Sequence, residues 1–222
     1  MKNTLKFAAT AAVMAGMLGS AQALEVTPGS GTVAAPATAA SALGTLLDSI
    51  STAITTPTFT GTARSAVYDG PEAGVNLNFL YQFTTTGGAD PIARLSAGGF
   101  TNWATDVFQS SDAFAPFVAG TVAATTVDRI GGTVGFNFVP TGVGNGESTN
   151  LLEIRTAATD YVTDWMGVLG STGGSAPAFA PAIPEPETYA LMLAGLGLLA
   201  FVGKRRMRNG GQANGRGEPS QA

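Results

Sequence analysis

The sequence contains no cysteine and no histidine. The absence of cysteine excludes disulfide bonds, thiol nucleophiles and cysteine-based zinc sites. The absence of histidine excludes a Ser-His-Asp triad and the ligation of haem by histidine. Stability must therefore come from a hydrophobic core, and we expect no cofactor and no metal. Carboxylates are the plentiful reactive groups that remain.

Positive charge is scarce in the central part of the chain. Between residues 24 and 183, twelve acidic side chains accompany four arginines, which gives a net charge of −8. The whole chain has a net charge of −4 because most of its basic residues lie near the two ends. An acidic region of this kind has no electrostatic reason to bind nucleic acid. We therefore expect no nucleic-acid partner.

Residues 1–23 have the pattern of a secretory signal peptide. Lys2 and Lys6 precede an apolar stretch at 7–18, and the small residues Ala21 and Ala23 follow it. A basic, an apolar and a small-residue segment in this order predict cleavage after Ala23. The rest of the chain is then expected to be exported.

A second targeting pattern lies between residues 184 and 208. The turn Pro184-Glu185-Pro186 is followed by an apolar segment at 188–203 and by a basic cluster, Lys204, Arg205, Arg206 and Arg208. As a helix, Tyr189–Val202 would span about 21 Å, which is short of a bilayer core of about 30 Å. The segment therefore fits either a buried core helix or a minimal membrane span. Cations directly after it favour one short transmembrane helix at 188–203 and a cytoplasmic tail at 204–222.

These three features, in this order, resemble the PEP-CTERM sorting domain of Gram-negative bacteria. The resemblance implies that a membrane enzyme, exosortase, recognises the segment, cleaves near Pro184-Glu185-Pro186 and passes the protein outward. It also implies anchoring in the inner membrane before processing, then a place at the cell surface or outside the cell, linked to exopolysaccharide and biofilm. The chain departs from the pattern in its hydrophilic extension, Asn209–Ala222.

Residues 24–170 are predicted to form one β-rich ectodomain. Apolar and polar residues alternate between Val75 and Thr84, which is typical of a half-buried strand. Further strand candidates are Thr60–Tyr68, Gly120–Val127, Val134–Phe138 and Leu152–Arg155. Short strands separated by glycine-rich turns favour an antiparallel β-sandwich or a jelly-roll-like fold.

The ectodomain sequence predicts a core and leaves one element open. The expected core residues are Phe79, Tyr81, Phe83, Phe136, Phe138 and Ile154. Between Leu43 and Ile54 the apolar spacing fits a helix and a strand equally well. Small residues and spaced prolines in 171–187 predict a spacer that need not pack and that ends in the sorting signature.

Candidate chemistry in the ectodomain is sparse. Asp106 and Asp112 flank a run that contains Trp103, and paired carboxylates can hydrolyse glycosides when about 5–9.5 Å apart. Sequence spacing does not determine that separation, so we expect no catalytic residues and no enzyme. The alternative function is a carbohydrate-binding module in which Trp103 and Trp165 stack on sugar.

Two turns contain oxygen ligands of the type that calcium prefers. They are Asp69–Glu72 and Gly144–Glu147, and ordinary turn chemistry accounts for both. The four arginines, which include Arg129 beside Asp128, are expected to form structural ion pairs with the surplus of acids.

Overall fold

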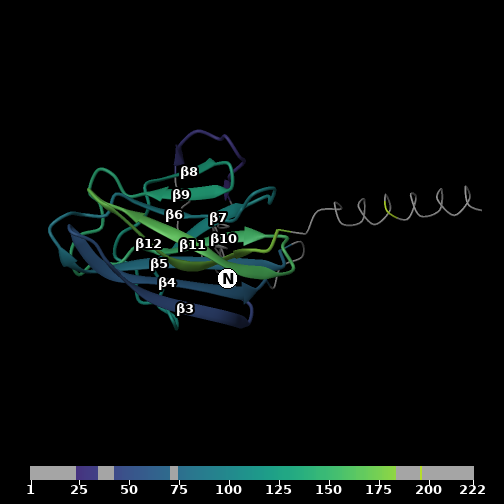
Figure 1. The fold of residues 1–222 in the computed structure, drawn as a ribbon, viewed down its shortest axis with the longest axis horizontal. Coiled ribbons are helices and arrows are strands. Elements are labelled where there is room, and N and C mark those ends of the chain that lie inside the picture. The colour runs from purple at the N-terminus through teal and green to yellow at the C-terminus, as the bar shows by residue number, and fades with distance from the viewer. Residues whose placement is uncertain (1–23, 35–42, 71–74, 184–195, 197–222) are drawn as a thin grey trace, which may run out of the picture.

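The computed structural model describes residues 24–34, 43–70, 75–183 and 196, which form two antiparallel sheets of six strands each (Figure 1). Sheet A has the order β1 (Leu24–Glu25), β7 (Asp106–Ser110), β10 (Leu151–Thr156), β5 (Leu77–Gly88), β4 (Phe59–Asp69) and β3 (Leu46–Thr55). Sheet B has the order β12 (Gly173–Pro181), β11 (Tyr161–Leu169), β6 (Arg94–Ala97), β9 (Thr133–Asn137), β8 (Thr126–Ile130) and β2 (Val33–Ala34). The predicted antiparallel, mostly β fold is confirmed.

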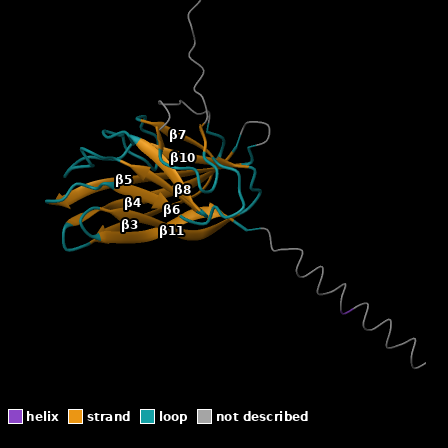
Figure 2. Ribbon diagram, turned by 90° about the horizontal axis from the view of Figure 1, so that it is seen from above, coloured by secondary structure: helices purple, strands orange, loops and turns teal. Residues whose placement is uncertain are grey.

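The two predicted targeting segments fall outside this description. The signal peptide at 1–23 and, apart from Leu196, the transmembrane helix at 188–203 lie beyond the described residues. Within the part of the chain that the structure describes, we find no helix with the length and apolar character needed to cross a membrane. Figure 2 shows that strands make up the body of the domain and that loops connect them at its periphery.

One hydrophobic core joins the two sheets. All six predicted core residues are at most 1% exposed, and they belong to one cluster that contains side chains from both sheets. Strand β12 of sheet B also contacts sheet A directly. The Tyr81 hydroxyl donates a hydrogen bond to the Phe179 carbonyl at 2.5 Å, and the Phe179 N–H donates to Ser65 Oγ at 3.0 Å.

The segment whose apolar spacing left helix and strand open is a strand. Residues 46–55 form β3, which pairs along β4 from Thr55↔Thr60 to Leu46↔Tyr68. Isoleucine, serine and threonine predominate in the segment, and β-branched side chains favour extended backbone. Ile50 and Ile54 face the core, whereas the residues between and after them are mostly exposed.

Strand β5 is buried on both faces, which corrects the prediction of a half-buried strand. Asn78 and Gln82 were expected to face solvent, yet both are buried. The loop between β7 and β8 covers this face of sheet A and contributes Phe114 and Phe117 to a second apolar cluster. Gln82 anchors the loop, since its Nε2 donates to the Val118 carbonyl at 2.7 Å and its Oε1 accepts from the Val118 N–H at 3.0 Å.

The predicted spacer at 171–187 is wrong in its first half. Residues 173–181 form β12, which pairs with β11 over nine residues, so the domain extends beyond the predicted boundary at 170. The side chains of Ala176, Ala178 and Ala180 are buried, and their small size lets β12 fit closely between β11 and sheet A. A second correction concerns Gly120–Val127, where Val122 forms one isolated bridge and β8 begins at Thr126.

Candidate functional site

The outer face of sheet B contains the most distinctive group of exposed polar and aromatic side chains. Along β6 and β11, the core-facing residues Leu95, Ala97, Met166 and Val168 are fully or almost fully buried. Successive side chains of a strand point to opposite faces. The alternate residues of both strands therefore point away from the core, and Trp165 is one of them.

The indole of Trp165 lies flat on the sheet above two glycines. The Gly98 N–H donates a backbone hydrogen bond to the Trp165 carbonyl at 3.1 Å. A Cβ atom at Gly98 would lie 2.8 Å from Cε2 and Nε1 of the indole, and one at Gly167 would lie 3.1 Å from Cζ3. Because neither glycine has a side chain, one face of the ring rests on the backbone. The residue remains 43% exposed, so the other side of the indole is open to a ligand.

A hydrogen-bonded group of side chains lies farther along the same face. The Arg94 guanidinium binds both carboxylate oxygens of Asp128, with Nη2 donating to Oδ1 at 2.6 Å, and Nη1 donates to Asn137 Oδ1 at 2.7 Å. The guanidinium covers Gly135, where a Cβ atom would lie 1.8 Å from Nη2. The hydrogen bond from Arg94 lowers the pKa of Asp128, as does that from Asn137, while partial burial opposes the shift.

We call Trp165, Ser96, Arg94, Asp128 and Asn137 the Trp165 face. Both groups reach the level of Ser96 on β6, because the guanidinium covers Gly135, the indole contacts Gly167, and both of these glycines pair with Ser96. Ser96 lies between them, with its Oγ 3.5 Å from the Gly167 carbonyl. An exposed aromatic surface in line with charged, amide and hydroxyl groups can stack on a sugar ring and bond to its hydroxyl groups.

The other predicted sugar-stacking residue does not form such a surface. Trp103 is partly buried and packs against the core. Its Nε1 is buried and has no hydrogen-bond partner among the described residues. The prediction of Trp103 as an exposed platform is therefore wrong, whereas Trp165 has the expected exposure.

The structure does not bring Asp106 and Asp112 together across a cleft. Asp106 begins β7 on sheet A, while Asp112 follows the end of that strand and accepts a hydrogen bond from Ser110 Oγ at 2.7 Å. Residues 106 and 110 alone are about 13 Å apart along a strand. Burial raises the pKa of Asp106, as does the nearby Glu25, while Arg155 lowers it.

The turns considered for calcium have ordinary local bonding. Glu147 closes its own turn by accepting the Gly144 N–H at 2.6 Å on Oε2. Asp69 is the last residue of β4, and Glu72 lies outside the described residues. The residues that the structure describes contain no group of three acidic side chains placed to hold a metal ion.

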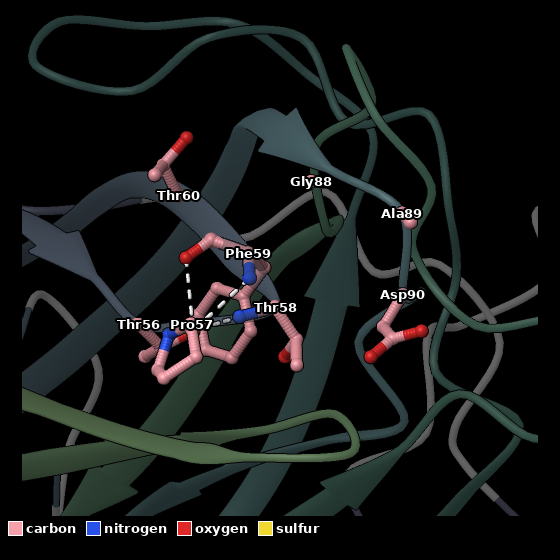
Figure 3. A pocket seen from close by; sticks show the side chains of 8 residues that line it. All are labelled: Thr56, Pro57, Thr58, Phe59, Thr60, Gly88, Ala89 and Asp90. Atoms are coloured by element: carbon pink, nitrogen blue, oxygen red, sulfur yellow. Dashed lines mark hydrogen bonds between the residues drawn. The ribbon is translucent and has the colours of Figure 1, made fainter.

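A pocket of about 290 Å³ lies at the hairpin between β3 and β4 and the end of β5 (Figure 3). Its hydroxyl groups already bond to neighbouring threonines outside the lining and to the backbone of the turn. Thr56 Oγ1 donates to the Phe59 carbonyl at 2.9 Å, and Thr58 Oγ1 lies 2.7 Å from Thr172 Oγ1. Asp90 is the one carboxylate in its lining, so the pocket has no carboxylate pair for catalysis.

In the part of the chain that the structure describes, Arg94 and Arg155 form ion pairs, whereas Arg129 makes a buried contact of another kind. Arg94 pairs with Asp128, and Arg155 Nε donates to Glu153 Oε1 at 2.8 Å. Arg129 does not pair with the adjacent Asp128, because neighbouring residues of β8 point to opposite faces. It is instead fully buried and donates to backbone carbonyls, so the predicted ion pair of Arg129 is wrong.

The predicted sorting and cleavage residues lie outside the described residues. These are Ala21, Ala23, Pro184, Glu185, Pro186, Lys204, Arg205, Arg206 and Arg208. The last backbone hydrogen bond before this region runs from the Ala182 N–H to the Asp160 carbonyl at 3.0 Å. The folded domain therefore extends to Ala182, two residues before the sorting pattern begins at Pro184.

Comparison with known proteins identifies that pattern. Residues 182–206 match the family model of the PEP-CTERM protein-sorting motif. No curated protein and no solved structure matches the chain significantly. The match covers the expected signature, the apolar segment and the first three cations of the basic cluster. The chain thus contains a PEP-CTERM protein-sorting motif at residues 182–206.

Proposed function

We propose that this protein is an exported surface or extracellular-matrix protein, sorted by exosortase and associated with exopolysaccharide and biofilm. The observation that carries the proposal is the PEP-CTERM motif at 182–206. The signal-peptide pattern at 1–23 supports export, and the β-sandwich formed by the two sheets is the cargo. In this scheme the apolar segment at 188–203 holds the protein in the inner membrane until it is processed.

The sorting signature has a physical rationale. Proline fixes its own φ and disfavours helix in the residue before it, so the sequence Pro184-Glu185-Pro186 favours an extended backbone over a helix. A protease binds extended backbone, and these prolines place such a stretch next to the apolar segment. The basic cluster Lys204, Arg205, Arg206 and Arg208 retains the tail in the cytoplasm.

Fractionation of cells with and without exosortase tests this function. With the enzyme, an ectodomain-tagged copy should lose its C-terminal segment and leave the inner membrane. Replacing Pro184 and Pro186 by alanine should leave full-length protein in the inner membrane. Uncleaved protein in the inner membrane of both strains would show that the segment is a permanent anchor.

A second function, saccharide binding, is supported by the geometry of Trp165. Its indole is exposed and flat on sheet B, and hydrogen-bonding groups continue along the same face. Since Arg94 and Asp128 neutralise each other, a neutral polysaccharide matches the Trp165 face better than a strongly charged one. This would connect the exported domain to the exopolysaccharide of the matrix.

Two variants of the full-length chain test saccharide binding in a polysaccharide pull-down. Trp165→Ala should reduce binding at least about tenfold, which corresponds to about 1.4 kcal/mol. Gly98→Ala keeps the tryptophan but places a methyl group where the ring rests, so it should weaken binding as well. Gly173→Ala is the matched control, because the nearest atom to its Cβ is Leu169 Cδ1 at 3.9 Å. Equal binding by all three variants would exclude the Trp165 face.

A further inference from the structure

The four edge strands of the two sheets differ in how their backbones are protected. Strands β1 and β2 have two residues each. Strand β12 has prolines at 177 and 181, and its Phe179 N–H bonds to Ser65 of sheet A. Strand β3 has ten residues and, among the described residues, pairs with β4 alone. It runs along the lower edge of the domain in Figure 1. Natural proteins usually blunt a long edge strand with proline, lysine or a covering segment.

The pairing of β3 with β4 determines which backbone groups point outward. The hairpin closes with a hydrogen bond from the Thr56 N–H to the Phe59 carbonyl at 2.9 Å, and the register continues without interruption from Thr55↔Thr60 to Asp48↔Val67. In an antiparallel pair, every second residue bonds to the partner strand. Even-numbered residues from Ile54 to Asp48 therefore bond to β4, and the odd-numbered residues 49, 51, 53 and 55 present their N–H and C=O groups outward.

The side chains of this edge suit strand pairing. Residues 49–55 contain no charge, no proline and no glycine, and they are rich in serine, threonine and isoleucine. Such segments have high β propensity and readily add another strand. At the beginning of β3, Leu46 and Leu47 are 42% and 45% exposed. An exposed pair of leucines beside an open ladder indicates an apolar contact with whatever pairs there.

We propose that the β3 edge pairs with the β3 edge of a second copy of this chain, in antiparallel orientation about a two-fold axis near Ser51. This joins the two copies of sheet A into one continuous sheet. In that register Ser49 faces Ala53 of the other copy. The exposed Leu47 lies at the irregularity between Leu46 and Asp48, just beyond the regular ladder, and comes close to Thr55 of the other copy. The same surface then serves both partners, as a two-fold interface requires.

Charge selects the antiparallel orientation. Asp48 is the only charged residue of β3. In a parallel in-register pair the two Asp48 carboxylates would be adjacent, and like charges directly opposite are destabilising. In the antiparallel pair centred on Ser51, each Asp48 faces residue 54 of the other copy. The two carboxylates are then about 20 Å apart along the ladder. Because the interface uses the β3 edge of both copies, the assembly stops at a dimer and does not continue into a fibre.

Cysteine cross-linking of the full-length chain tests the interface, because the natural chain has no cysteine. Ser51→Cys places one thiol at the proposed two-fold axis, and a short thiol-reactive cross-linker should convert most of the protein to a covalent dimer. Thr163→Cys, on the exposed part of β11, is the matched control and should yield at least about tenfold less dimer at the same protein concentration.

A proline substitution at a residue whose N–H group points away from β4 distinguishes backbone pairing between two copies from cross-linking by chance collision. In the Ser51→Cys chain, Ala53→Pro removes an N–H group that points away from β4, so the contact with β4 is retained. Cross-linked dimer should fall at least tenfold, while Ala53→Val, which keeps the N–H group, should leave it unchanged. Circular dichroism checks that both variants retain the β spectrum. Dimer from Ser51→Cys no greater than from Thr163→Cys would overturn the proposal, as would equal dimer from the folded Ala53→Pro and Ala53→Val variants.

Discussion

Replacing Arg129 by methionine should lower the free energy of unfolding by about 2–3 kcal/mol. Arg129 is fully buried, and its guanidinium connects three separate segments. It donates to the Val26 carbonyl and to Thr105 Oγ1, both at 3.0 Å, to the Phe100 carbonyl at 2.5 Å and to the Gly131 carbonyl at 3.2 Å. No carboxylate among the described residues forms an ion pair with it. Methionine has a similar length but no donor and no charge.

Two opposing effects determine that magnitude. Four hydrogen bonds from a charged donor, at about 1.5 kcal/mol each, contribute about 6 kcal/mol. The low value is appropriate because two acceptors keep other donors, Thr105 Oγ1 for the Val26 carbonyl and the Trp103 N–H for the Phe100 carbonyl. Methionine also removes a buried charge, which relieves a cost of about 3–4 kcal/mol. The difference is the predicted loss, measured by urea unfolding of the full-length chain with tryptophan fluorescence.

Lysine at position 129 should behave differently from methionine because it can lose its proton. Burial lowers the pKa of the Arg129 guanidinium, and it would lower that of a lysine below the ordinary value of about 10.4. The folded state would then bind fewer protons than the unfolded state, so the stability of Arg129→Lys should rise with pH up to about 10. Arg129→Met should lack this rise. A methionine variant within about 0.5 kcal/mol of wild type, or a lysine variant without the rise, would refute this account.

Three further substitutions test separate parts of the structure by urea or thermal unfolding. The hydrogen bond from Arg94 lowers the pKa of Asp128, so its stabilisation exists above the unfolded pKa of about 3.9 and is lost as pH falls through the folded pKa. Asp128→Asn should therefore cost about 1 kcal/mol at pH 7 and almost nothing at pH 2. Burial raises the pKa of Asp106, so its charge destabilises the fold above the folded pKa, and Asp106→Asn should raise Tm at pH 7 but not at pH 3. Tyr81→Phe removes the hydrogen bond to the Phe179 carbonyl and should cost about 1 kcal/mol. An unchanged stability in that variant would contradict the contact between β12 and sheet A.

The strands with strong local patterns could be predicted from the sequence. Alternation of large apolar residues identified the core strands β5 and β9, because period two is a property of each strand by itself. The second face of β5 could not be identified in this way. Gln82 is polar, and its burial depends on a loop that lies more than thirty residues later in the chain and supplies its hydrogen bonds. Polar residues are compatible with burial when a distant backbone supplies their hydrogen bonds.

Strand β12 was missed because its local composition points elsewhere. Glycine, alanine and proline have low β propensity and are typical of linkers. In the folded chain the register with β11 and the narrow space against sheet A select small side chains, so tertiary packing overrides propensity.

The glycines beneath Trp165 and Arg94 are a related case. A glycine inside a strand can mark a close approach of another group, and Gly135 between Val134 and Phe136 was such a signal. The sequence does not show which side chain fills the space above such a glycine, because that side chain comes from a different strand.

The Trp165 face and the β3 edge occupy different sheets, and this separation has a functional consequence. Trp165 lies on the outer face of sheet B, whereas β3 is the edge of sheet A. Pairing through β3 would therefore leave the Trp165 face of each copy open. A single exposed indole with a few polar neighbours can supply only weak binding to one sugar, but two such faces in one dimer would engage a repeating polymer together. The second contact is then intramolecular, and avidity can exceed the single-site affinity by about 10²–10⁴-fold. A repeating polysaccharide is the kind of ligand for which this gain operates, since it offers many equivalent sites to a dimer released among its chains.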